Sequence, residues 1–160
     1  MPVADVRFFR RGVSKVFYVA TIASTSAPTA AEVNAGVNLT ATIADVQGFT
    51  YTNQPITTPD LGDNLDTKVP GVDQVADSTL HIYEKRTTNT GRTTLAKGVV
   101  GYLVIFFAGI AGATPAAADK ADVWPVQSAG TPRDYSMTEA AKWHVALIIT
   151  GRPNEDVALV

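Results

Sequence analysis

The segment at positions 98–112, GVVGYLVIFFAGIAG, is the strongest constraint on the fold because nearly every residue in it is apolar. A helix that crosses a bilayer needs roughly 20 such residues, and this run is shorter. β-Branched and aromatic residues fill its centre and glycines bound it, which favours a buried strand. The rest of the chain must therefore supply apolar partners for a strand within positions 99–110.

Three further segments show the alternation of a strand. At positions 14–22 the side chains divide with period two into Val16, Tyr18, Ala20 and Ile22 on one face and Lys15, Phe17, Val19 and Thr21 on the other. At positions 78–85, Leu80 and Ile82 share one face, which is suited to a core. The segment 140–151, AAKWHVALIITG, also alternates, but both of its faces are largely apolar. We expect this last strand to be covered on both sides.

Two weaker strands and two short helices complete the predicted elements. Positions 41–52 indicate a strand bent at Gly48, and positions 122–128 indicate one interrupted at Pro125. The sequence TAAEVNAG predicts a two-turn helix, with Thr29 and Glu32 forming a capping box and Gly36 ending it. A second short helix is expected at 92–97, closed by Gly98.

Composition favours a single, mainly β domain that belongs to an assembly. The chain has 160 residues, a length that one core can serve. Only 18% of its residues are charged whereas 46% are hydrophobic, so we expect other subunits to cover part of its surface. The net charge of −2 argues against a protein that grips nucleic acid by neutralising phosphates. The chain has no cysteine, which excludes disulfides and thiolate zinc sites.

Positions 53–76 form an unusually long connection that contains Pro55, Pro59 and Pro70 and lacks sustained periodicity. Loops of this length are usually functional or disordered. Asp60, Asp63 and Asp66 suggest a calcium loop, but counting from Asp60 puts leucine at the sixth position and glycine at the twelfth, where an EF-hand needs glycine and glutamate. A solvated or interface loop is favoured, and an irregular ion site remains the alternative; no metal site is assigned.

The two ends of the chain, positions 1–12 and 152–160, have no evident core of their own and are predicted to be arms. The N-terminal one carries RFFRRG, in which Arg7, Phe8, Phe9 and Arg10 mix basic and aromatic side chains. Such a cluster could stack bases and bind phosphates, but in a slightly acidic chain anchoring on a neighbouring subunit is favoured. A secretory signal that ends near Ala27 is a further alternative.

No arrangement of residues predicts catalysis. His81 and His144 each fall in the middle of a predicted strand, where a packed or hydrogen-bonded histidine is the common case. No serine lies in a Gly-x-Ser-x-Gly elbow, and the glycines at 109–112 complete neither a dinucleotide fingerprint nor a P-loop. The chain is predicted not to be an enzyme, and no cofactor is assigned.

The ordered elements SKVFYVATIA, TAAEVNAG, IADVQGFTYT, TTPDLGDNLDTKVPG, STLHIYEK, RTTLAKG before GYLVIFFAG, and WHVALIITGRP cover nearly the whole chain. In this order they resemble the major tail tube protein of long, flexible-tailed (siphovirus-type) bacteriophages, particularly those that infect actinobacteria. The Asp-rich loop and the short helix followed by glycine and a hydrophobic strand carry most of the resemblance.

The resemblance implies a β-sandwich or barrel with short flanking helices and a long inter-strand loop. It also implies that six copies form a ring and that rings stack into the tube through which the genome passes. The implied partners are further copies of the chain, the tape measure protein, and the tail terminator or tip proteins, with DNA passing through the lumen without specific binding. The implied location is the virion tail, assembled in the host cytoplasm, and no membrane span is expected.

Carried over to this chain, the resemblance assigns the loop at 53–76 to contact with an adjacent ring and both termini to bridges between subunits. The predicted interface residues are Pro59, Asp60, Asp63, Asp66, Lys68, Pro70, Arg7, Phe8, Phe9 and Arg10. The alternatives are another tail or head structural subunit, such as a terminator or decoration protein, and a secreted β-sandwich that binds a ligand.

Overall fold

A computed structural model describes residues 7–160, which form a mainly β chain with two short helices. In chain order the elements are β1 Lys15–Val19, α1 Ala30–Ala35, β2 Val37–Asn38, β3 Ile43–Gln47, β4 Tyr51–Asn53, β5 Ile56–Thr58, β6 Thr67–Val69, β7 Asp73–Val75, β8 Ser78–Tyr83, α2 Thr90–Thr94, β9 Val100–Phe106, β10 Lys120–Gly130, β11 Arg133–Asp134, β12 Lys142–Ile149 and β13 Asn154–Ala158. None of the helices in residues 7–160 is both long and apolar enough to cross a membrane.

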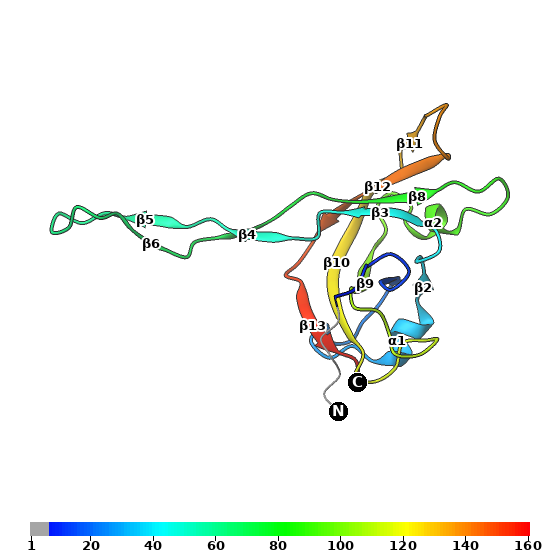
Figure 1. Ribbon diagram of the computed structural model, residues 1–160, viewed down its shortest axis with the longest axis horizontal. Coiled ribbons are helices and arrows are strands. Elements are labelled where there is room, and N and C mark those ends of the chain that lie inside the picture. Colours follow the sequence, from blue (N-terminus) through cyan, green and yellow to red (C-terminus); the bar gives the residue numbers. More distant parts are fainter. Residues whose placement is uncertain (1–6) are drawn as a thin grey trace.

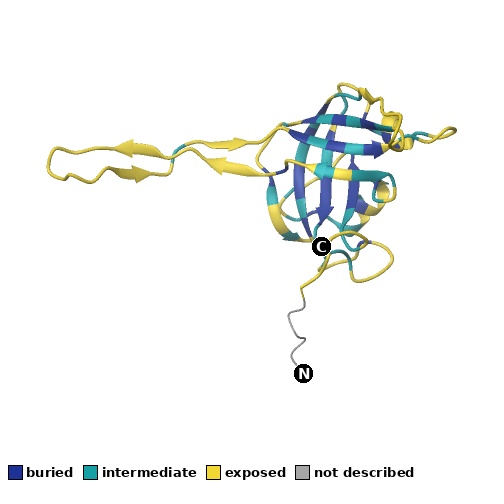
Figure 2. Ribbon diagram, turned by 45° about the horizontal axis from the view of Figure 1, so that its top comes forward, coloured by how far each residue is buried: buried dark blue, intermediate teal, exposed yellow. Residues whose placement is uncertain are grey.

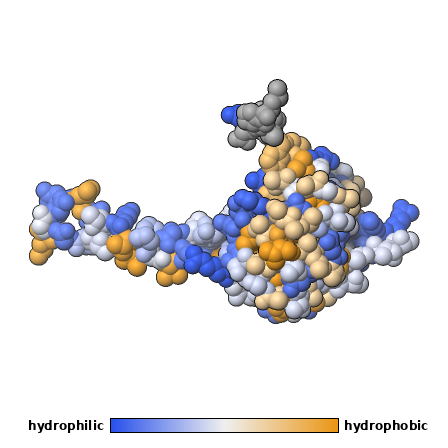
Figure 3. Space-filling view, turned by 90° about the horizontal axis from the view of Figure 1, so that it is seen from below, coloured by the Kyte–Doolittle hydropathy of each residue, from blue (hydrophilic) through white to orange (hydrophobic). Residues whose placement is uncertain are grey.

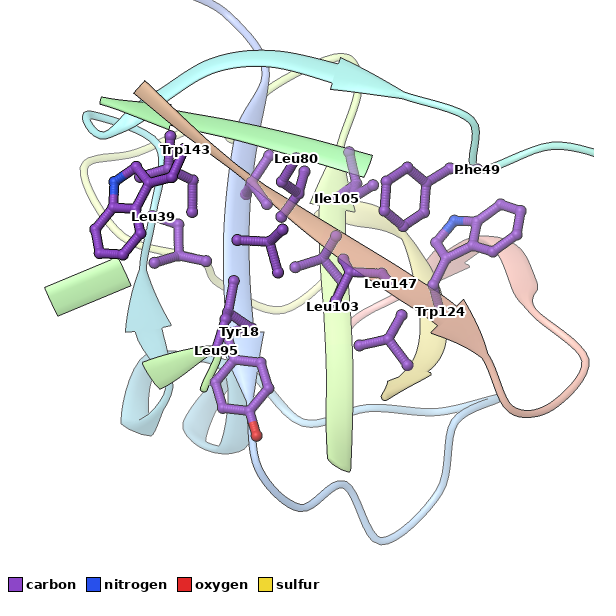
Figure 4. Close-up of a cluster of buried hydrophobic side chains, with 14 residues drawn as sticks. Tyr18, Leu39, Phe49, Leu80, Leu95, Leu103, Ile105, Trp124, Trp143 and Leu147 are labelled. Atoms are coloured by element: carbon purple, nitrogen blue, oxygen red, sulfur yellow. The ribbon is translucent and has the colours of Figure 1, made fainter. Parts of the chain in front are cut away.

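One nine-stranded antiparallel sheet makes up the body of the molecule. Its strands follow the order β2-β1-β9-β10-β12-β8-β3, with β11 added beside β12 and β13 beside β10. The sheet curves so strongly that β12, β8 and β3 lie across β1 and β9 (Figures 1 and 4). The result is consistent with the predicted β-sandwich fold, and we call this body the barrel.

The concave side of the sheet encloses the larger of two hydrophobic cores (Figure 4). Its buried side chains come from both halves of the curved sheet and from the connections between strands: Val16, Tyr18, Leu39, Phe49, Leu80, Ile82, Leu95, Leu103, Ile105, Trp124, Val126, Trp143, Val145 and Leu147. Alternate residues of β8 and β12 enter this core, as the sequence pattern predicts.

The opposite face of β1, β9 and β10 packs under α1 and forms a second core. Leu103 and Ile105 of β9 point into the first core, whereas Val104 and Phe106 point into the second. Strand β9 is therefore covered on both faces, which explains the uninterrupted apolar run at 98–112 and confirms the expectation of a buried strand.

Helix α1 begins with the predicted capping box. The Thr29 side chain accepts a hydrogen bond from the Glu32 backbone N–H, and the Glu32 carboxylate accepts one from the Thr29 N–H. The backbone N–H groups of Thr29 and Ala23, which both donate to this carboxylate, lower the pKa of Glu32. The helix ends at Gly36 as expected, and its Val33 is fully buried in the second core.

The expected interruption of a strand at Pro125 is wrong, because β10 runs through this residue without a break. Pro125 pairs with Tyr102 of β9 on one side and accepts a hydrogen bond from Thr150 N–H on the other. A strand residue directs its N–H and C=O to the same side, so the missing N–H of Pro125 faces the gap between the end of β12 and the start of β13. Pro125 lies just past the last paired residues of β10 and β12, Val126 and Ile149, so its missing N–H does not interrupt that ladder.

Two other expectations need correction. Only one face of β12 is covered within the chain, since Ile148 on the other face is 55% exposed. The C-terminal segment is not a free arm, because β13 pairs with β10 and Leu159 is buried in the second core. The predicted N-terminal arm falls partly on residues 1–6, which lie outside the described residues.

Candidate subunit interfaces

A long hairpin, residues 50–76, projects from the barrel and is called the arm below (Figures 1 and 2). It consists of two successive antiparallel ladders, β4 with β7 and β5 with β6. From its root to its turn the arm spans about eleven residues, which at the rise of a β-strand corresponds to about 35 Å. The long connection expected at 53–76 lies within the arm, and it forms paired strands although its sequence lacks sustained periodicity.

The root of the arm is fixed to the barrel. Strand β3 ends just before Gly48, whose φ of +83° is open to few residues other than glycine, and a Cβ there would lie 2.4 Å from the Asp77 carbonyl oxygen. The next side chain, Phe49, is buried and packs edge-on against Trp124 with 5.5 Å between ring centroids. Its N–H donates to the hydroxyl of buried Ser78, so both strands of the arm leave the core at a defined position.

The arm meets the end of β12 around a hollow of about 310 Å³, lined by Tyr51, Asp73, Val75 and residues 149–153. The Tyr51 hydroxyl hydrogen-bonds the Glu155 carboxylate at 3.4 Å, and the Arg152 guanidinium lies 3.9 Å from the Asp73 carboxylate. These contacts are exposed, so each adds little to stability. They do favour one direction of the arm relative to the barrel.

The two ladders of the arm are separated at a pair of prolines, Pro55 and Pro70, which cannot donate ladder hydrogen bonds. The Asn53 side chain bridges this break, because it both donates to the Gly71 carbonyl and accepts from the Gly71 N–H. A Cβ at residue 71 would lie 2.1 Å from the Gln54 carbonyl oxygen, so only glycine permits this close approach. The arm therefore continues past the prolines as a paired ribbon.

The arm tip, residues 59–66, contains four of the predicted interface residues: Pro59, Asp60, Asp63 and Asp66. Asp60 accepts a hydrogen bond from Gly62 N–H at 2.7 Å, and Asp63 accepts one from Leu65 N–H at 3.1 Å. These two carboxylates thus shape the turn, a role that Asp commonly has. Of the other predicted arm residues, Lys68 lies in β6 and Pro70 lies at the break between the ladders.

Nearly the whole arm is exposed, including its apolar side chains (Figure 2). Hydrophobic residues recur along its length out to the tip (Figure 3). Those with large exposed areas are Tyr51, Ile56, Leu61, Leu65, Val69, Val72 and Val75. A two-stranded ribbon with no third strand and no covered face is marginally stable in water. Its exposed apolar residues and open strand edges therefore suit contact with another chain.

The second predicted surface is the N-terminal segment, residues 7–12, all of which are exposed. The Arg10 guanidinium lies 4.6 Å from the centre of the Phe107 ring, and the Arg10 carbonyl accepts hydrogen bonds from Val13 and Ser14 N–H. Arg10 thus holds the segment against the barrel, while Phe8 and Phe9 are 53% and 76% exposed. The structure does not bring this segment together with the arm of the same chain (Figure 1).

Pairing of β8 with β12 creates a cluster that sequence reasoning missed. His81 and His144 face each other across the two strands, and Asp134 of β11 binds both. The distance from its carboxylate is 2.8 Å to His144 Nδ1 and 3.6 Å to His81 Nδ1. Pairing the two predicted strands so that His81 lies opposite His144 could have suggested that the two histidines meet. Within residues 7–160 no group of three or more His, Asp or Glu side chains has the arrangement needed to hold a metal ion.

The connection between β11 and β12, residues 135–141, forms a second exposed tip that was not predicted. Tyr135 and Met137 are almost fully exposed there, and Lys142 forms an ion pair with Glu139 at its base. This ion pair lowers the pKa of Glu139 through its hydrogen bond and charge, and it raises the pKa of Lys142. The sequence signal for this hairpin is weak, because β11 has only two residues and cannot show the alternation of a strand.

Comparison with known proteins agrees with this architecture. The fold is similar to that of a chain in the cryo-EM structure of the anti-feeding prophage baseplate, described as six-fold symmetrised. The match covers 97% of this chain and 98% of that chain, with a TM-score of 0.60 and 9% sequence identity. No curated protein matches the sequence. The model of the family described as phage tail tube protein matches residues 1–160. Because that match spans the whole sequence, the chain belongs to the phage tail tube protein family and is a structural component of a phage tail.

Proposed function

We propose that six copies of this chain form a ring, that the rings stack into the tail tube, and that the phage genome passes through the lumen on its way to the host. The observation that carries the proposal is the arm, an ordered but almost uncovered ribbon that exposes apolar side chains far from the barrel. If the ribbon lies on a subunit of an adjacent ring, that subunit can cover its exposed apolar side chains and pair with its open strand edges.

The ring is supported by the surface of the barrel itself. Val100 of β9 and Ile148 of β12 are each more than half exposed, although both lie in strands of the central sheet. Neighbouring copies in a ring would cover such residues. The similar chain comes from a particle described as six-fold symmetrised, which supports six as the number of copies.

The proposed partners follow from the place of a tube in a tail. Further copies of the chain form the rings, the tape measure protein fills the lumen during assembly, and terminator or tip proteins close the ends. The net charge of −2 suits a wall along which DNA slides without specific binding. The order of sequence elements favours the long, flexible-tailed phage type with an actinobacterial host, and assembly in the host cytoplasm.

Electron microscopy of the purified chain, and of the phage particle that carries it, tests the proposal. We expect six-fold rings that stack into tubes, and antibodies against the chain should label the tail along its length. A monodisperse monomer that never polymerises, and whose antibodies label the head or one end of the tail, would contradict the proposal. That outcome would favour a decoration or terminator subunit instead.

A further inference from the structure

We propose that the arm tip of one copy docks on the N-terminal segment of a second copy, with the aspartates of the tip facing the arginines of the segment and its leucines facing the phenylalanines. This inference rests on the proposed function, because it names the surface that the arm meets on the neighbouring subunit. Four observations carry it: the separation of charge, the exposed apolar side chains, the anchoring of the segment and the direction of the arm.

Charge is separated between the two surfaces. The arm tip contains Asp60, Asp63 and Asp66 and no basic residue. The N-terminal segment contains Arg7, Arg10 and Arg11 and no acidic residue. Opposite charges on two exposed surfaces steer them together and disfavour contact of either surface with its own kind. A tip–tip or segment–segment contact would bring like charges together.

The apolar side chains of the two surfaces also match. Leu61 is fully exposed and Leu65 is 68% exposed at the tip, while Phe8 and Phe9 are exposed in the N-terminal segment. Each surface thus surrounds large apolar groups with charge, the composition of a contact with an apolar centre and a polar rim. Burying the leucines against the phenylalanine rings would remove apolar area from water on both sides.

The N-terminal segment is held in place before any contact. Arg10 stacks on Phe107 of its own barrel, and the hydroxyl of Ser14 donates to the Phe107 carbonyl oxygen at 2.7 Å. At the tip, the turn is held by Asp60 and Asp63, which accept hydrogen bonds from backbone N–H groups. These contacts within the single chain reduce the conformational freedom that has to be lost when the two surfaces meet.

A second basic surface offers a comparison. Lys85 and Arg86 are exposed in the connection between β8 and α2, and the next residues are threonines. This loop could attract the aspartates of the tip, but residues 84–89 include no large apolar side chain, and the neighbouring Tyr83 is less exposed, at 41%, than Phe8 and Phe9. The N-terminal segment is therefore the better match.

The arm points away from the barrel, so its tip does not lie beside the N-terminal segment of the same chain (Figures 1 and 2). The contact must then join two copies through different surfaces. A heterologous contact either closes into a ring or continues from copy to copy. Between copies of adjacent rings it continues, as stacking of rings requires.

Cysteine cross-linking tests the pairing, because the chain has no cysteine of its own. One chain carries Leu61→Cys and another carries Phe9→Cys; the two are mixed, assembled and mildly oxidised. We expect a reducible dimer of the two different chains as the main product in tubes. The matched control pairs the Leu61→Cys chain with a Thr87→Cys chain, which places the second thiol in the loop of Lys85 and Arg86, and it should give no such dimer.

Charge variants provide an independent measurement. Replacing Asp60, Asp63 and Asp66 with Asn keeps oxygen acceptors for the turn but removes three charges. We expect tube yield to fall about tenfold, since three exposed ion pairs of ordinary strength account for such a factor. The control variant Lys85→Glu/Arg86→Glu should assemble normally.

The pairing would be overturned if tubes formed without the dimer between the Leu61→Cys and Phe9→Cys chains, or if the control dimer formed instead. Either result would leave the proposed function unchanged. Unchanged tube yield in the triple Asn variant would also overturn the pairing. If the unmodified chain formed no stacked rings at all, the proposed function would be contradicted, and the pairing with it.

Discussion

The barrel and the arm are built from the same kinds of residue but are stabilised in different ways. In the barrel, β-branched and aromatic side chains fill two cores, and strands β1, β9 and β10 are covered on both faces. In the arm, similar side chains stay in contact with water and the strands have only one neighbour each. Regions with few buried apolar contacts open most easily, so the arm is expected to be the least stable part of the isolated chain.

The two regions therefore differ in where their stabilising contacts come from. The barrel has the burial that an independent fold needs, whereas the arm gains comparable burial only if a second chain covers it. The boundary between them is narrow, because Phe49 is buried while Tyr51 is already exposed. Mutations on the two sides of this boundary should therefore have different consequences.

Trp124→Ala should have the largest effect on stability. The Trp124 ring is fully buried and packs against Phe49, so its removal should lower the free energy of unfolding by about 3–5 kcal/mol. Val72→Ala in the arm is the control, with an expected loss of less than about 0.5 kcal/mol. Chemical denaturation followed by tryptophan fluorescence and circular dichroism measures both. Equal losses in the two variants would show that the arm and barrel do not differ as described.

Gly48→Ala should have the next largest effect, because it acts at the boundary itself. The new Cβ would combine an unfavourable positive φ with overlap against the Asp77 carbonyl oxygen, for a loss of about 2 kcal/mol or more. Gly98→Ala is a matched control: its φ is also positive, at +87°, but nothing lies within 4 Å of its Cβ position. It should cost about 1 kcal/mol. Thermal melts that rank the two variants in the reverse order would argue against a tightly held root.

Thr29→Ala should destabilise the barrel by about 1 kcal/mol, because it removes the side-chain cap of α1 and with it one support of the second core. Thr87→Ala, at an exposed position outside the helices and strands, should change stability by less than about 0.5 kcal/mol. Differential scanning calorimetry of the two variants gives the comparison. An equal shift in melting temperature would mean that the capping box contributes nothing.

Much of the barrel can be predicted from the sequence because its signals are local. The capping box of Thr29 and Glu32 lies within one helical turn, and the alternation in β8 marks its buried face directly. The apolar run that contains β9 indicates burial on both faces, since no polar side of the strand is present. The bend at Gly48 is also predictable, although the change of sheet that it produces is not.

The features that sequence reasoning missed depend on contacts between distant residues. The course of β10 through Pro125 depends on where β12 ends and β13 begins, and the docking of β13 depends on a free edge of β10. His81, His144 and Asp134 meet only because of the strand register. In the arm, the short runs beside Pro55 and Pro70 are too brief for clear alternation, so their pairing is evident only in three dimensions.

Deletion of residues 57–71 tests whether the arm joins adjacent rings, because it removes the outer arm and leaves the barrel and the root intact. We expect the free energy of unfolding to change by less than about 0.5 kcal/mol, since this stretch contributes no residue to either core. Electron microscopy should find single rings or monomers and no tubes. Tubes of normal length and yield from the shortened chain would contradict the role of the arm in stacking.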